Sequence, residues 1–218
     1  MSFWSLTGEG GWLMLVLMLP ILLCSIIALA IFIERLLVLR KMKINTRTFM
    51  LQIQAMIRKG RISDGIMLCK KTPGPVAKIT KAGLERLKRP RAEVKEAIES
   101  VGKAEIYQLE RHLGILATIA AIAPLFGFLG TVIGMMEAFA QIVKRHGIVG
   151  PDVLAGGIWE ALSTTAFGLI VGIIAIIAHN WIQGKIEMHV FQMQQSSIDL
   201  LDLTLAQQVP EHELSDKS

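Results

Sequence analysis

Thr131, Thr165 and Glu160 stand out because they lie within or beside the most apolar parts of this sequence. A hydroxyl or carboxylate in hydrocarbon is costly unless it is hydrogen-bonded, protonated or next to water, so such residues often mark ion paths. A threonine can instead bond the backbone carbonyl one helical turn back and serve helix packing alone. The two threonines are therefore candidate pore-lining residues, with packing as the alternative.

Glu160 has two interpretations of equal weight. It follows Trp159, and this pairing is typical of the interface between lipid and water, outside the hydrocarbon. Within the hydrocarbon the same carboxylate would need a proton, a partner or water, which is typical of functional residues. The residues alone leave both interpretations open.

Small residues recur at helical spacing around both threonines. The stripes are Ala120, Pro124, Gly127, Thr131, Gly134 and Ala138, then Ala161, Thr165, Gly168, Gly172, Ala175 and His179. Steps of three and four residues keep positions on one helix face, and small residues mark faces where helix backbones approach closely in a bilayer. The sequence therefore predicts helix packing at Gly127, Gly130, Gly134, Gly168 and Gly172.

Three apolar runs without Asp, Glu, Lys or Arg are long enough to cross a bilayer: residues 10–33, 113–136 and 161–184. The chain has 218 residues, of which 52% are hydrophobic, and this share is high for a soluble domain. Trp12 and Trp181 stand near the ends of two runs, where interfacial tryptophans concentrate. The sequence predicts an all-α membrane protein with three transmembrane helices.

The distribution of Lys and Arg predicts the orientation. Residues 34–111 hold 19 of the 23 basic residues against eight acidic ones, and basic flanks of spans remain in the cytoplasm. This places 34–111 and the C-terminus inside and the N-terminus outside. A basic segment can also bind nucleic acid, but no recognisable nucleic-acid module accompanies the charge, so membrane topology and anionic lipid headgroups explain it better.

A cleavable secretory signal is a weaker interpretation of the first apolar run. Ala28 and Ala30 resemble a small-residue cleavage site. A signal, however, has a basic stretch before about 7–15 apolar residues. Here Glu9 is the only charge before a longer run, and cleavage would export the most basic part of the chain.

The expected order of segments follows from these spans. It is an external N-terminus (1–11), transmembrane helix 1 (12–33), a cytoplasmic helical domain (34–112), transmembrane helix 2 (113–140), a short external loop (141–157), transmembrane helix 3 (158–182), and a cytoplasmic C-terminal helix and tail (183–218).

Long cytoplasmic helical extensions are expected within this order. Turn residues and apolar spacing predict helices over 46–59, 63–70 and 76–87, with a break at 73–75 and a further helix after Pro90. No breaker separates that helix from the second span, so we expect one unbroken helix there. The third span should continue as a helix up to Pro210, followed by a disordered tail.

The sequence offers no catalytic or metal centre. Cys24 and Cys69 fall on a predicted span and a predicted cytoplasmic segment, so they provide no disulfide framework. The five histidines are scattered, and no zinc-ligand spacing, phosphate-binding glycine loop or nucleophile elbow occurs. We therefore expect no enzyme activity, no metal and no cofactor.

The small-residue segments resemble the MotA/TolQ/ExbB family of proton-channel subunits. Residues 123–135 read APLFGFLGTVIGM, residues 158–169 read IWEALSTTAFGL, and the exit of the first span at 32–35 reads FIER. The resemblance covers most of 12–205. It is closest to ExbB and TolQ, which have three spans, whereas MotA has four.

This resemblance implies a multi-pass protein of the bacterial inner membrane, with periplasm on its outer side. It implies a homo-oligomer, a pentamer in ExbB-like members, around a pore that holds two single-span ExbD- or TolR-like subunits. The partner's helix carries the intramembrane aspartate, and the positions of Thr131 and Thr165 line the ion path. Glu160 matches the family's glutamate, where conduction and packing both remain open.

The implied activity is that of a motor stator. Protons, rather than sodium ions, flow inward and drive a TonB- or TolA-like protein that spans the periplasm, in a Ton, Tol or other system. Two features depart from the family: residues 172–175 read GIIA where a proline is common, and His179 replaces a common tyrosine. A non-conducting scaffold for a single-span partner is the alternative, and it would tolerate apolar replacement of both threonines.

Overall fold

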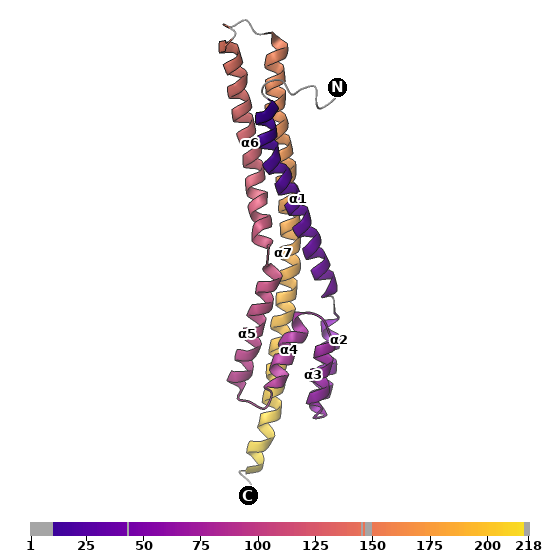
Figure 1. The fold of residues 1–218 in the computed structure, drawn as a ribbon. Coiled ribbons are helices and arrows are strands. Elements are labelled where there is room, and N and C mark those ends of the chain that lie inside the picture. The colour runs from indigo at the N-terminus through magenta and orange to yellow at the C-terminus, as the bar shows by residue number, and fades with distance from the viewer. Residues whose placement is uncertain (1–10, 43, 145, 147–149, 216–218) are drawn as a thin grey trace. The chain divides into compact units, whose positions relative to one another are not determined.

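The computed structural model describes residues 11–42, 44–144, 146 and 150–215. These residues form seven helices and no strand, which confirms the all-α prediction (Figure 1). The helices are α1 (Gly11–Lys41), α2 (Thr46–Arg58), α3 (Ile62–Lys71), α4 (Pro75–Glu85), α5 (Arg91–Glu110), α6 (Leu113–Lys144) and α7 (Pro151–Ser215).

The chain divides into two compact units, and α1 and α7 contribute to both. The apolar unit contains the described residues up to Glu34 together with His112–Trp181. The basic unit contains Arg35–Arg111 and the described part of α7 from Ile182 onward. The candidate ion path lies in the apolar unit.

The apolar unit consists of three helices, belonging to α1, α6 and α7, that are long and apolar enough to cross a membrane. Large apolar side chains such as Leu22, Leu125 and Ile174 are about 60% exposed, at 59%, 63% and 62%. In water such an exterior would be unfavourable, whereas the acyl chains of a bilayer solvate it. Phe32 of α1 packs edge-on against Trp181 of α7, with ring centroids 6.0 Å apart.

The basic unit has a conventional hydrophobic core. Its fully buried members come from α2, α4, α5 and α7: Ile53, Ile57, Val76, Ile79, Leu84, Val94 and Leu200. Gly83 has no side chain because a Cβ there would meet Leu200 of α7. Lys78 of α4 bonds both carboxylate oxygens of the buried Glu105 of α5 at 2.8 Å.

Local signals fix the ends of the short helices as the sequence predicts. Asn45 caps α2 by accepting a hydrogen bond from the Thr48 amide at 3.1 Å. Gly74 adopts φ 110°, which only glycine reaches easily, and Pro75 follows as the first residue of α4.

The expectation of one unbroken helix into the second span is wrong. The helix stops at Glu110, His112 adopts φ 64°, and α6 begins at Leu113. The reason is a side chain that is distant in the sequence. The buried guanidinium of Arg35 donates to the Gln108 carbonyl oxygen at 3.0 Å and to the Leu109 carbonyl oxygen at 3.3 Å. These carbonyls no longer need amides from a following turn.

Two further boundaries differ from expectation. Helix α7 continues past Pro210 to Ser215, because an interior proline removes one amide donor without forcing a helix to end. The tail beyond Ser215 lies outside the described residues. Helical turns also extend into the expected loop at 141–157, since α6 ends at Lys144 and α7 begins at Pro151.

Candidate functional site: the contact between α6 and α7

Helices α6 and α7 touch through their backbones at Gly127 and Gly168. A Cβ on Gly127 would lie 3.0 Å from the Thr164 carbonyl oxygen and 3.0 Å from Thr165 Cα. A Cβ on Gly168 would lie only 2.6 Å from the Ala123 carbonyl oxygen. A Cβ on Gly168 would force the backbone of α6 to shift, and a Cβ on Gly127 would be tighter than ordinary packing. This close approach brings polar groups of α7 against the backbone of α6.

The other three glycines singled out by the sequence face the same contact. A Cβ on Gly130 would lie 2.7 Å from Thr164 Cβ, and a Cβ on Gly134 would lie 2.8 Å from Ala161 Cβ. A Cβ on Gly172 would lie 2.6 Å from Pro124 Cγ. All of these neighbours belong to the same chain, so the glycines bring two helices of one subunit together.

The hydroxyl of Thr165 joins the two helices. Its Oγ1 donates to the Gly127 carbonyl oxygen at 2.7 Å, and the side chain is half-buried. An interhelical hydrogen bond of this kind stabilises helix association in a bilayer by about 0.6 kcal/mol on average. The oxygen lone pairs of the hydroxyl can still accept a hydrogen bond from water or from a proton carrier.

Thr131 lies elsewhere on α6. Its hydroxyl donates to the Phe128 carbonyl oxygen of its own helix at 2.7 Å, and the side chain is half-exposed. The two threonines therefore do not share a hydrogen-bond partner within one chain. A path that includes both would have to be completed by groups from outside this chain.

Sequence reasoning missed Thr164, which is the buried hydroxyl at the contact. It is 2% exposed, packs on Gly130, and donates to the Ala161 carbonyl oxygen at 2.7 Å. Its Oγ1 also lies 3.4 Å from the Gly127 carbonyl oxygen that Thr165 binds. The available signal was its place one turn before Gly168, on the face where small residues gather.

Sequence reasoning also missed Glu137 of α6. Glu160 of α7 is half-buried one helical turn before Thr164. Glu137 of α6 is also half-buried, and its neighbour Ala138 faces Gly157 of α7, where a Cβ would lie 3.1 Å from Ala138 Cβ. Neither carboxylate forms an ion pair within the part of the chain that the structure describes. Two uncompensated carboxylates on neighbouring apolar helices are typical of groups that face water or a partner.

The remaining candidates lie apart from this contact. His179 Nδ1 is 3.2 Å from the Asn180 side-chain oxygen, toward the end of the α7 segment in the apolar unit. Across the described residues, no group of three or more His, Cys, Asp or Glu side chains is arranged to hold a metal ion.

Comparison with known proteins places this arrangement in a family. Residues 71–195, which include α6 and most of α7, match the model of the "MotA/TolQ/ExbB proton channel family". An ExbB homologue named for biopolymer transport in Methanothermobacter thermautotrophicus is 33% identical over 155 residues, covering 71% of this chain and 54% of its own length.

Two further relatives are also an ExbB and a TolQ protein. The biopolymer transport protein ExbB of Aquifex aeolicus is 38% identical over 104 residues, which is 48% of this chain and 69% of the relative. The Tol-Pal system protein TolQ of Haemophilus influenzae is 38% identical over 96 residues, which is 42% of this chain and 41% of the relative. This chain thus spans about half the length of the first of these relatives. With its three apolar helices, the chain is a multi-pass membrane protein that belongs to the MotA/TolQ/ExbB proton channel family, on its ExbB/TolQ side.

Proposed function

We propose that this chain is the channel subunit of a motor in the bacterial inner membrane, in which an inward flow of protons moves a periplasm-spanning partner. The observation that carries the proposal is the contact between α6 and α7. There Thr165 bonds the Gly127 carbonyl oxygen beside the buried Thr164, and Glu160 and Glu137 lack ion-pair partners among the described residues. This places polar groups along a seam between two apolar helices.

The path itself is completed by other subunits. Several copies of this chain, five by the resemblance to ExbB, surround single-span ExbD- or TolR-like helices that carry the intramembrane aspartate. Thr131 and Thr165 line the space that faces this aspartate, and Glu160 serves at the mouth, in conduction or in packing. The ion is H⁺ rather than Na⁺, and no resident cofactor takes part.

The work is delivered outside the membrane. Moving one charge across the membrane releases about 2.3 kcal/mol per 100 mV, so several protons must pass for one substantial conformational step. A TonB- or TolA-like protein receives this energy. The names of the relatives, biopolymer transport for two and the Tol-Pal system for the third, support a role in energising the cell envelope.

The test replaces both path threonines by valine, in the double variant Thr131→Val/Thr165→Val. Valine keeps the shape of threonine and removes the hydroxyl, so the complex with the single-span partner should still co-purify. Work that depends on the proton-motive force, such as siderophore uptake or maintenance of envelope integrity, should be lost.

Thr118→Val is the matched control, because this α6 threonine is exposed and, among the described residues, donates to the Gly114 carbonyl oxygen of its own helix alone, at 2.9 Å. It should retain full activity. If a complex that carries both valines supports normal siderophore uptake and envelope integrity, the proposal is contradicted and a scaffold that does not conduct is favoured.

A further inference from the structure

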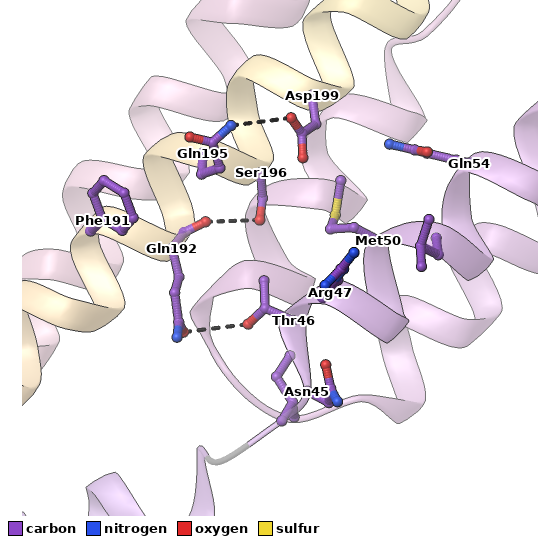
Figure 2. Close-up of a pocket in the computed structure, with 12 residues that line it drawn as sticks. Asn45, Thr46, Arg47, Met50, Gln54, Phe191, Gln192, Gln195, Ser196 and Asp199 are labelled. Carbon is purple, nitrogen blue, oxygen red and sulfur yellow. Dashed lines mark hydrogen bonds between the residues drawn. The ribbon is translucent and has the colours of Figure 1, made fainter.

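A groove between α2 and α7 lies in the basic unit, and the proposed ion path does not account for it. It has a volume of about 490 Å³ and contains both apolar and charged side chains. Figure 2 shows Arg47, Met50 and Gln54 of α2 on one side and Phe191, Gln195 and Asp199 of α7 on the other. The Thr46 hydroxyl donates to the side-chain oxygen of Gln192 at 3.3 Å and ties the two helices together.

The groove presents apolar surface that the fold of one chain leaves exposed. Phe191 is 65% exposed and Leu51 is 58% exposed, and both line the groove. Phe191 follows Trp181 by ten residues, which is about 15 Å along a helix. Exposed aromatic and aliphatic side chains framed by charges are typical of a protein-binding surface.

The outer face of α5 carries the matching features. Tyr107 is 76% exposed there, while the opposite face of α5 buries Val94 and Leu109 in the core. Lys103 lies one turn before Tyr107, and Glu110 lies about one turn after it, both of them exposed. The α5 face therefore presents an aromatic ring between a cation and an anion.

The charges of the two surfaces are complementary. The groove offers Arg47 and Asp199, and the α5 face offers Glu110 and Lys103. Within the described ranges none of these four side chains forms an ion pair. Among the described residues, the Asp199 carboxylate accepts a single long hydrogen bond, from Gln195 at 3.4 Å.

The charges on the groove and on the α5 face also follow a matching order, counted from the nearest span. Arg47 comes soon after the first span, and Asp199 lies far beyond the third. Glu110 is close to the second span, and Lys103 is farther from it. All copies of a membrane protein share one orientation in the bilayer. Arg47 of one copy would therefore face Glu110 of its neighbour, and Asp199 would face Lys103.

We propose that the groove between α2 and α7 binds the α5 face of a second copy of this chain. Tyr107 packs on Phe191 and Leu51, and the two charge pairs at the rim fix the register. Aromatic anchors supply most of the binding energy at such interfaces, and rim charges chiefly supply specificity. This contact rests on the proposed function, which requires several copies around a pore.

The placement of the two surfaces determines the kind of assembly. In Figure 1, α5 and α2 lie on opposite sides of the α7 segment of the basic unit. The α5 face of one copy therefore cannot bind in the groove of that same copy. A contact between two different surfaces is heterologous, so repeated copies form a ring when the rotation between them closes, and not a two-fold dimer. A ring is the arrangement that a central pore needs.

Cysteine cross-linking in native membranes tests the contact. In a background with Cys24→Ala and Cys69→Ala, the double variant Phe191→Cys/Tyr107→Cys should form a ladder of cross-linked multimers upon oxidation. Either cysteine alone should form none, because a heterologous contact never brings two copies of the same position together. Met67→Cys combined with Tyr107→Cys is the matched control, because Met67 is 56% exposed on α3 and lies outside the groove.

Charge reversal adds a second readout. Lys103→Glu or Asp199→Lys in the double-cysteine chain should reduce the ladder at least severalfold, and the two reversals together should restore it. Absence of a ladder from the double-cysteine chain, dimers from Phe191→Cys alone, or cross-links to a single-span partner instead of this chain would each overturn the proposal.

The same cells separate this inference from the proposed function. If the valine double variant abolishes work while no ladder forms, the channel role stands and the α5 contact fails. If the ladder forms but both valines permit normal work, the contact stands and the channel role fails.

Discussion

The carbonyl oxygen of Gly127 accepts the hydrogen bond between α6 and α7 at the point where the backbones of the two helices touch. It accepts a hydrogen bond from Thr165 at 2.7 Å, and Thr164 Oγ1 lies 3.4 Å away. Both hydroxyls reach it only because neither Gly127 nor Gly168 has a Cβ to hold the helices apart. The glycines are thus a requirement of the polar seam rather than a general feature of membrane helices.

Gly168→Ala should destabilise the protein by about 1–3 kcal/mol, the usual cost of overpacking. The added methyl group would meet the Ala123 carbonyl oxygen at 2.6 Å, which is backbone and cannot move aside cheaply. Gly184→Ala on the same helix has open space and should be neutral or slightly stabilising. Thermal unfolding in detergent compares the two, and equal melting temperatures would contradict the close contact.

Cys69 should be inert in the folded protein. Burial raises the pKa of its thiol from 9.0 to about 12, so the reactive thiolate is scarce at pH 7–9. Because the pKa is raised on folding, the protonated thiol favours the native state below pH 9, and this contribution is lost as the pH rises toward 12. Maleimide labelling at pH 7.5, followed by mass spectrometry, should modify Cys69 only after denaturant is added.

Met67→Cys provides the control for this labelling experiment. Met67 is two residues away on α3 and is 56% exposed, so a cysteine there should react in the folded protein. Equal labelling rates at positions 67 and 69 would show that Cys69 is accessible.

At the level of elements, the end of α5 depends on Arg35 of α1. The guanidinium is 4% exposed and donates to two terminal carbonyls of α5, while the preceding Glu34 places its Oε2 3.0 Å from His112 Nδ1. Adjacent residues of one helix thus hold the end of α5 and the start of α6. The glutamate and arginine that close the first span have a structural role at this break.

Arg35→Met should therefore destabilise the protein by about 1.5–3 kcal/mol, the range for hydrogen bonds to a charged group. The loss should be local, with faster amide hydrogen exchange in the last turn of α5. Arg40→Met, an exposed position on the same helix, is the control and should leave exchange unchanged. Unchanged exchange in Arg35→Met would show that the carbonyls of α5 do not depend on this side chain.

The whole molecule combines an apolar unit that requires lipid with a basic unit that has its own core. Basic residues concentrate in 34–111, so the side of the membrane on which this segment lies sets the orientation of the chain. The channel proposal requires the basic unit to be cytoplasmic, since the energy transducer acts in the periplasm.

Cysteine accessibility in intact cells tests this orientation. With Cys24 and Cys69 replaced by alanine, Gly147→Cys should react with a membrane-impermeant thiol reagent. Lys88→Cys should remain unlabelled until the membrane is permeabilised. The reverse pattern would invert the protein and end the stator interpretation.

The sequence alone determined the spans, the all-helical class and the faces on which small residues gather. Hydrophobic length and periodicity are local properties, and each helix shows them independently of its neighbours. The short helices, too, begin and end within two residues of the predicted bounds, and the Pro-Gly-Pro segment separates α3 from α4 as predicted, because turns are encoded within a few residues.

Only the tertiary structure decided which groups meet. The bond between Thr165 and Gly127 joins residues 38 apart, and the bond between Arg35 and Gln108 joins residues 73 apart. Glu137 lies outside the small-residue stripes and Thr164 only borders one of them, so the position of both at the helix contact is decided by the facing helix. A helical period states which residues share a face, but the packing of two helices decides which carbonyl a hydroxyl reaches and where a helix stops.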